Sequence, residues 1–320
     1  ANAFDCLSIV GVPLFVMLSG ALMLDASYTL TGKKLAQKTL RLLAAYFAWL
    51  LFYNIVNFFR EGCPLSLLSV RRNIFLETLL GRGIYHLWFL PMLAGLYLIT
   101  PFLRKFSDDE ALCRYFLLLY FAVTIFFPTL LKFDFRFRTI AEGLYTRIPF
   151  QMVTGYTGYY VLGHYLHAFS LHKTALPSLP KRVCLLLLAL LGFISFTVGH
   201  LVCFFDAIRR GELSTILNDP YSVNDFLTAA AIFLFVKVAC TWTADAISSR
   251  LSRTVFTLTE DTLGVYLLHP FLLMLAEDFS LTTRFAPAAF SLPVCILVVF
   301  SLSLLLAHGL KKLPLIRYFL

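Results

Sequence analysis

Apolar residues gather in long, nearly uninterrupted runs, and this is the dominant pattern of the 320-residue chain. Hydropathy marks nine such runs, at residues 4–24, 42–59, 86–103, 115–131, 150–169, 183–203, 223–241, 262–276 and 289–309. A helix of about 20 apolar residues is long enough to cross the hydrocarbon core of a bilayer. The pattern therefore predicts an all-α, polytopic transmembrane helix bundle, with nine spans in a single integral-membrane domain over residues 1–320.

Composition and cysteine usage narrow the class of protein further. The chain is 59% hydrophobic and only 14% charged, with a mean hydropathy of +0.80, whereas soluble domains are about one quarter charged. The seven cysteines are scattered without a C-x-x-C pair, so neither a metal site nor a disulfide framework is predicted. The net charge of +9 lies mostly between the apolar runs, where it suits lipid headgroups. We therefore expect membrane lipid, and not nucleic acid, as its partner.

The joining segments divide the basic residues unequally between the two sides of the membrane. One alternate set, which includes the dense run at residues 33–41, holds 15 of the 27 Lys and Arg residues, and the other set holds 11. Because cytoplasmic loops carry the excess of Lys and Arg, we assign the first set to the cytoplasm. Residue 1 would then lie outside, and it is Ala rather than Met. We expect the chain to be N-terminally incomplete, with one more helix upstream and ten spans in the complete protein.

The segment TGKKLAQKTLR on the cytoplasmic side carries a basic stripe. Lys34, Lys38 and Arg41 are spaced i, i+4 and i+7, so in a helix they share one face. Such a stripe suits a phosphate-rich ligand such as the ADP moiety of coenzyme A. Binding to anionic lipid headgroups explains the same charges equally simply.

The segment GRGIYHLWFLPML places a histidine at the start of an apolar run. Tyr85 and Trp88 are residue types that collect at membrane interfaces, and His86 lies between them. If the segment is helical, His86 shares a face with Leu90 and can point into the bundle. A neutral imidazole can take a proton from a hydroxyl near pH 7. His86 is therefore a candidate general base, with an interfacial structural role as the alternative.

Two further runs carry polar residues at helical spacing. In EDTLGVYLLHPFLL, Thr262, Tyr266 and His269 form one polar stripe, which favours either hydrogen bonds between helices or a site in the bundle interior. We expect Glu260 and Asp261 to cap the start of this helix. In VGVPLFVMLSGALML, Ser19 and Gly20 allow close helix packing, or alternatively line a cavity.

The segment KFDFRFRTIAEGLYTRIPF lies on the outer side in this assignment. Arg136 and Arg138 alternate with aromatic residues, and Glu142 follows. Aromatic faces with guanidinium and carboxylate groups suit a sugar, and Arg also suits a lipid-linked pyrophosphate. Binding of lipid headgroups is the alternative interpretation.

Three of these segments resemble the acyltransferase-3 family of integral-membrane acyltransferases. They are VPLFVMLSGALML, YHLWFLPMLAGLYLITPFL and TLGVYLLHPFLL, in the family's order, and YTGYYVLGHYL is a looser match. Within the family the chain is most similar to the branch that O-acetylates bacterial surface polysaccharides, including enterobacterial common antigen. The resemblance implies a ten-helix bundle in the bacterial inner membrane, with acetyl-CoA or another acyl-CoA as donor, a glycan or lipid-linked sugar as acceptor, and no metal.

The resemblance also assigns roles to the candidate residues. The family's leading catalytic histidine lies on its first helix, and no residue here matches it, so His86 and His269 take supporting catalytic roles. Tyr85, Trp88, Arg136, Arg138, Glu142, Tyr266 and Ser19 are then expected to bind substrate, and Lys34, Lys38 and Arg41 to bind acyl-CoA. Lys38-Thr39-Leu40-Arg41 replaces the family's R-x-x-R pattern and loses one guanidinium group.

Two other function classes fit the same composition. A transporter or flippase of a lipid-linked or anionic sugar would also use outer arginines and intramembrane histidines. Many transporters contain internal repeats, and the sequence has no convincing one. A membrane scaffold without enzymatic activity would use its polar stripes only to pack helices.

Overall fold

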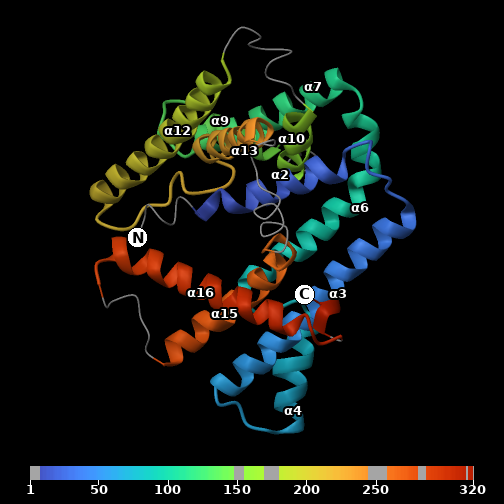
Figure 1. Ribbon diagram of the computed structural model, residues 1–320. Coiled ribbons are helices and arrows are strands. Elements are labelled where there is room, and N and C mark those ends of the chain that lie inside the picture. Colours follow the sequence, from blue (N-terminus) through green and yellow to red (C-terminus); the bar gives the residue numbers. More distant parts are fainter. Residues whose placement is uncertain are drawn as a thin grey trace. The chain divides into compact units, whose positions relative to one another are not determined.

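The computed structural model describes residues 8–147, 155–168, 180–243, 258–279, 286–314 and 316–319 (Figure 1). These residues form helices and connecting segments, and no strand occurs among them. Parts of the predicted runs at 4–24 and 150–169 lie outside the described residues. The all-α prediction is confirmed for the part of the chain that the structure describes.

Each of the nine predicted runs contains helix. The helices are α2 (Gly11–Met23), α3 (Gly32–Arg60), α6 (Phe89–Ser107), α7 (Glu110–Tyr120) continued by the π-helix η3 (Phe121–Phe126) and α8 (Phe127–Leu131), α10 (Thr157–Ala168), α12 (Lys181–Arg210), α13 (Val223–Thr243), α15 (Thr262–Asp278) and α16 (Ala288–Leu310). The joining segments add α4 (Leu67–Val70), η1 (Arg71–Leu76), α5 (Glu77–Leu79), η2 (Tyr85–Trp88), α9 (Arg138–Arg147) and η6 (Ile316–Tyr318).

Six helical stretches of the described residues are long and apolar enough to cross a membrane. The helices of the other three runs are shorter: α2 has 13 residues, α10 has 12 and α15 has 17. Long helices such as α12 and α16 expose many Leu, Ile and Phe side chains, as lipid-facing helices do. The protein is thus an integral membrane protein, and the count of nine spans stays a prediction.

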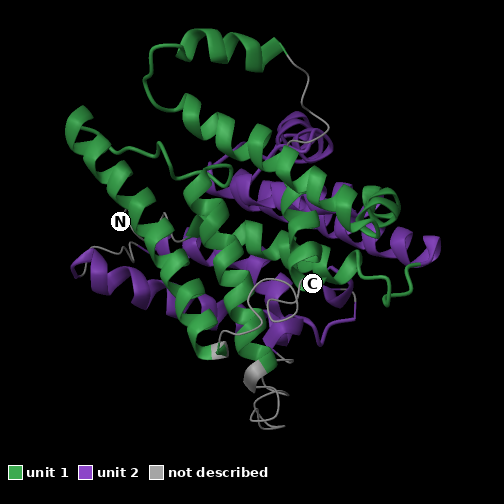
Figure 2. Ribbon diagram, turned by 90° about the horizontal axis from the view of Figure 1, so that it is seen from above, with its two compact units in different colours: residues 1–30, 99–246 green, residues 31–98, 247–320 purple. Residues whose placement is uncertain are grey.

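The residues group into two compact units, coloured separately in Figure 2. Unit 1 contains residues 1–30 and 99–246, and unit 2 contains residues 31–98 and 247–320. Helix α6 begins in unit 2 and ends in unit 1, because the boundary between the units falls at residues 98 and 99. Each unit is therefore built from segments that are far apart in the sequence.

In unit 1, α2 packs closely against α10 because glycines remove side chains where the two helices cross. A Cβ atom added at Gly20 would collide with the backbone carbonyl of Tyr160, and one added at Gly163 would collide with that of Met17. Small residues allow this close approach of membrane helices. The packing role predicted for Gly20 is therefore confirmed.

The end of α2 is held by a side chain from α6. The Arg104 guanidinium donates hydrogen bonds to the carbonyl oxygens of Met23 (2.8 Å), Asp25 (3.1 Å) and Tyr28 (2.9 Å). The last carbonyls of a helix have no partner within it, so a cation at this point satisfies them and also suits the helix dipole. A basic residue that the sequence assigned to a cytoplasmic loop is here a structural cap.

In unit 2, a buried apolar cluster joins α3, η2 and α15. Tyr53, Leu87, Leu90 and Leu267 are fully or almost fully buried in it. Helix α15 also packs against α16. The long helix α3 begins ten residues before the predicted run at 42–59, so the basic segment and the apolar segment form one continuous helix.

Candidate functional site

Two histidines from distant parts of the sequence meet in unit 2. His86 lies in η2 and is only 7% exposed, while His269 lies in α15. The centroids of the two rings are 5.6 Å apart. The rings of Tyr53 (5.3 Å) and Tyr266 (5.5 Å) stand edge-on to the His86 ring. The structure thus brings together two of the predicted catalytic histidines and the predicted Tyr266.

Both tyrosines bind the backbone of the elements that carry the histidines. The Tyr266 hydroxyl donates a hydrogen bond to the carbonyl oxygen of His86. The Tyr53 hydroxyl donates to the carbonyl oxygen of Leu267 (2.6 Å), two residues before His269. Each tyrosine therefore fixes the backbone next to one histidine, which is how a reactive side chain is held in position.

Tyr53 was not predicted from the sequence. It lies in an apolar run that also contains Tyr46, Trp49 and Phe52, and no spacing distinguishes it from these residues. Its role depends on its meeting α15, which a sequence pattern of α3 alone does not show.

The ring of His86 has unsatisfied hydrogen-bonding capacity. Both of its nitrogens are buried and neither has a hydrogen-bond partner. A buried polar atom without a partner costs about 1–3 kcal/mol. Such atoms are rare in folded proteins and often occur where a ligand or water completes the site. The His86 ring therefore has two hydrogen-bonding positions available to a polar group that reaches it.

An apolar groove of about 770 Å³ reaches His269 within unit 2. It is formed by α15, α16 and the segment before α6, and His269 and Tyr85 contribute to its wall. Apart from these two residues and Glu277, the lining side chains are aliphatic, aromatic or sulphur-containing. The groove suits a hydrocarbon chain or another apolar group, and His269 is the histidine in its wall.

The two aromatic residues close to His86 in the sequence, Tyr85 and Trp88, do not bury its ring. Tyr85 is 85% exposed and Trp88 is 41% exposed. Large exposed aromatic side chains at the start of a membrane helix are typical of the membrane interface. The aromatic-belt interpretation therefore fits Trp88, whereas Tyr85 also borders the groove.

The predicted basic stripe lies on the first turns of α3. Lys34, Lys38 and Arg41 are exposed, and Thr31 caps the helix by accepting a hydrogen bond from the Lys34 amide (3.3 Å). Twelve residues separate Arg41 from Tyr53, which is about 18 Å along a helix axis. One helix thus carries both the exposed cations and a tyrosine of the histidine site.

The other predicted site residues belong to unit 1. Ser19 is half-buried in α2. Arg138 forms an ion pair with Asp134 at 2.7 Å, while Arg136 and Glu142 are exposed. A polar pocket of about 510 Å³, which the sequence did not predict, lies elsewhere in this unit and is lined by residues such as Lys132, Arg210 and Glu212.

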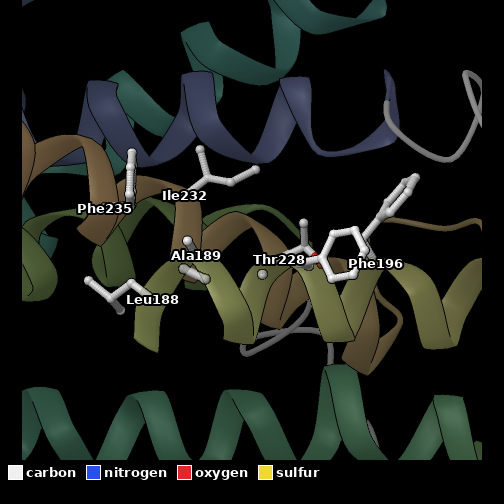
Figure 3. A pocket seen from close by; sticks show the side chains of 9 residues that line it. Leu188, Ala189, Phe196, Thr228, Ile232 and Phe235 are labelled. Atoms are coloured by element: carbon white, nitrogen blue, oxygen red, sulfur yellow. The ribbon is translucent and has the colours of Figure 1, made fainter. Parts of the chain in front are cut away.

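A second pocket of unit 1 lies between α12 and α13 and is apolar (Figure 3). Its only polar side chain is Thr228, whose hydroxyl donates to the Asn224 carbonyl at 2.7 Å. This pocket contains no acid, base or nucleophile. Across the described residues, no group of three His, Cys, Asp or Glu side chains could hold a metal ion.

Comparison with known proteins agrees with the resemblance of the sequence motifs. The sequence model of a family described as an acyltransferase domain matches residues 4–308. No curated protein and no solved structure matches the chain. The family match covers both histidines, the basic stripe, the first eight apolar runs and all but the last residue of the ninth. The chain, an integral membrane protein of helices, therefore belongs to the acyltransferase-3 family.

Proposed function

We propose that the protein is a membrane O-acyltransferase, and specifically an O-acetyltransferase of the branch that modifies bacterial surface polysaccharides such as enterobacterial common antigen. It moves an acyl group from cytosolic acyl-CoA to a hydroxyl of a cell-surface glycan or a lipid-linked sugar, in the bacterial inner membrane. The observation that carries the proposal is the close contact of His86 with His269 in a chain that belongs to an acyltransferase family.

The donor binds with its phosphates on Lys34, Lys38 and Arg41. These three cations are exposed on one helix, and phosphate groups bind well to such clusters. The distance of about 18 Å along α3 to Tyr53 is of the order that an extended pantetheine arm can bridge. The thioester of the bound donor would then lie beside His86 and His269.

The histidines supply general acid–base catalysis. One imidazole takes the proton from the sugar hydroxyl as its oxygen attacks the thioester carbonyl and forms a new C–O bond. The C–S bond of the tetrahedral intermediate then breaks, and the proton passes to the departing thiolate. The products are an O-acyl sugar and free coenzyme A. The expected histidine on an upstream helix stays a prediction, and His86 and His269 act in support of it.

The proposed acceptor contacts are taken for each unit by itself: Tyr85, Trp88 and Tyr266 in unit 2, and Ser19, Arg136, Arg138 and Glu142 in unit 1. The exposure of Arg136 and Glu142 supports this proposal, because they are accessible to a large glycan. The ion pair of Arg138 with Asp134 orients that guanidinium. Hydrogen bonds from such groups orient a sugar without taking part in the chemistry.

A His86→Ala variant tests the proposed function. We expect acetyl-CoA-dependent acetylation of glycan in membrane vesicles to fall at least about tenfold, at the low end of the effect of losing a general base. Transfer of radiolabelled acetyl groups measures it. His200→Ala is the matched control, because His200 lies on α12 in unit 1 and is not one of the predicted site residues. Unchanged turnover with normal membrane insertion would remove His86 from the site.

A further inference from the structure

Pro270 directly follows His269 inside helix α15. In a regular helix the N–H of each residue donates to the carbonyl oxygen four residues earlier. Proline has no N–H, so the carbonyl oxygen of Tyr266 loses its helix partner. The chain therefore presents a free acceptor one turn before Pro270, on the same helix as the histidine.

The side chain of His269 occupies this free position. Its Nδ1 atom lies 2.8 Å from the carbonyl oxygen of Tyr266 and 3.3 Å from that of Val265. A carbonyl oxygen only accepts hydrogen bonds, so the proton of the neutral imidazole must be on Nδ1. The other nitrogen, Nε2, then carries the lone pair.

We infer that Pro270 is a positioning residue that fixes the tautomer of His269 and leaves Nε2 as the proton acceptor of the site. Free histidine side chains in water favour the opposite tautomer, with the proton on Nε2. The helix backbone, opened by the proline, reverses this preference. The assignment of Nε2 as the base for an acceptor hydroxyl rests on the proposed function, whereas the tautomer does not.

The two histidines differ in their exposure and in the hydrogen bonds of their rings, and this difference suggests different roles. His269 is half-buried and borders the apolar groove, so a substrate group can reach its ring. His86 has no hydrogen-bond partner on either ring nitrogen, so nothing fixes its tautomer before a ligand binds. His269 is therefore preorganised as a base, and His86 adapts to the group that it meets.

A second backbone carbonyl in the turn before Pro270 is also bound by a side chain. The Tyr53 hydroxyl donates to the carbonyl oxygen of Leu267 at 2.6 Å. A side chain inserted into the helix ladder in this way keeps the helix locally open. The opening made by Pro270 is thus stabilised by a residue of α3.

A Pro270→Ala variant restores an N–H that competes with His269 for the Tyr266 carbonyl. Protein labelled with ¹⁵N-histidine in lipid nanodiscs is measured by NMR at a pH where the side chains are neutral, because protonated and bare ring nitrogens have well-separated shifts. Comparison with a His269→Gln spectrum assigns the signal among the seven histidines. We expect Nδ1–H in the wild type and loss of that signal, with a gain of Nε2–H, in the variant.

Pro293→Ala is the matched control, because Pro293 also lies inside a helix of unit 2 but follows Leu292. It should leave the His269 signal unchanged. A wild-type spectrum with the proton on Nε2, or a Pro270→Ala spectrum identical to wild type, would overturn the inference. Acetyl transfer by the same samples is a separate readout: a tautomer change in a protein without transferase activity would contradict the proposed function and leave the inference intact.

Discussion

At the scale of single residues, polar side chains bind backbone carbonyls in both units. In unit 1, Arg104 binds the last carbonyl of α2 and two carbonyls of the segment that follows it, and the Lys237 ammonium donates to the Leu166 carbonyl at 2.9 Å. In unit 2, Tyr53 and Tyr266 do the same beside the two histidines. Carbonyls without a helix partner must be satisfied within a membrane protein, and these side chains meet that requirement.

Gly20 provides a residue-scale test of the packing of α2 against α10. Gly20→Ala places a methyl group against the Tyr160 carbonyl, which belongs to a rigid helix backbone. We expect the free energy of unfolding to fall by about 1–3 kcal/mol or more, as overpacking does. A lower melting temperature in detergent, followed with a thiol-reactive dye, measures this loss.

The control for Gly20 is Gly95→Ala in α6, where a Cβ atom would meet nothing within 4 Å. That substitution should leave the melting temperature equal or higher, because alanine favours helix by about 1 kcal/mol over glycine. Equal melting temperatures for the two variants would mean that α2 and α10 do not cross at Gly20.

At the scale of elements, an ion cluster joins the start of α15 to the end of α16. The Asp261 carboxylate lies 2.7 Å from Lys311 Nζ and 3.2 Å from His308 Nδ1, and it makes no capping hydrogen bond to its own helix. Asp261 therefore occupies the N-cap position of α15, as predicted, but its carboxylate binds side chains at the end of α16 and no amide of its own helix.

The Asp261 cluster makes stability depend on pH. Burial disfavours the charged carboxylate, but hydrogen bonds from Lys311 and His308 outweigh it and hold the pKa of Asp261 below its usual value of 3.8. A depressed pKa in the folded state stabilises the protein above the unfolded value, and this stabilisation disappears as the pH falls through the folded value. Asp261 therefore contributes fully near neutral pH and loses its contribution below about pH 3.8.

Asp261→Asn should lower the free energy of unfolding at pH 7 by about 1.5–3 kcal/mol, the range for hydrogen bonds to a charged group. The difference in melting temperature between wild type and variant should be constant from pH 7 to pH 5 and shrink below pH 3.8. Glu260→Gln is the control, because only the backbone carbonyl of Glu260 binds Lys311. A difference that does not change with pH would show that the carboxylate charge contributes nothing.

At the scale of the whole molecule, the exposed surface of the long helices is apolar. Helices α12 and α16 expose large hydrophobic side chains along their length, which a bilayer covers. The charges of the joining segments then decide the orientation. The proposed reaction requires that Lys34, Lys38 and Arg41 face the cytoplasm, where acyl-CoA is found.

Cysteine labelling tests this orientation in a variant without native cysteines. Lys33 and Leu213 are exposed and lie in joining segments assigned to opposite sides. We expect a membrane-impermeant maleimide to label Leu213→Cys in intact spheroplasts, and Lys33→Cys only after the membrane is opened. The reverse pattern would place the basic stripe outside and exclude it as the site for cytosolic acyl-CoA.

Much of the fold follows from sequence patterns that need no tertiary information. The nine apolar runs each contain helix, and the Thr262, Tyr266 and His269 stripe lies on one, α15. The start of α3 was not predicted, because hydropathy detects only its apolar part and the basic residues before it are equally good helix formers. The short helices of the joining segments were not predicted either, because hydropathy detects only long apolar runs.

The sequence by itself determined the helical class, the membrane location and the family, because run length, apolar content and short motifs are properties of neighbouring residues. It also indicated His86 and His269, each from its own segment. Only the tertiary structure decided that their rings lie 5.6 Å apart, since the two segments are far apart in the sequence and meet through the hydrogen bond of Tyr266 to the His86 carbonyl. Hydropathy describes every helix in the same way and does not specify which faces pack together. The roles of Tyr53 and Pro270 therefore follow only from the structure, because they depend on which side chain binds which backbone carbonyl.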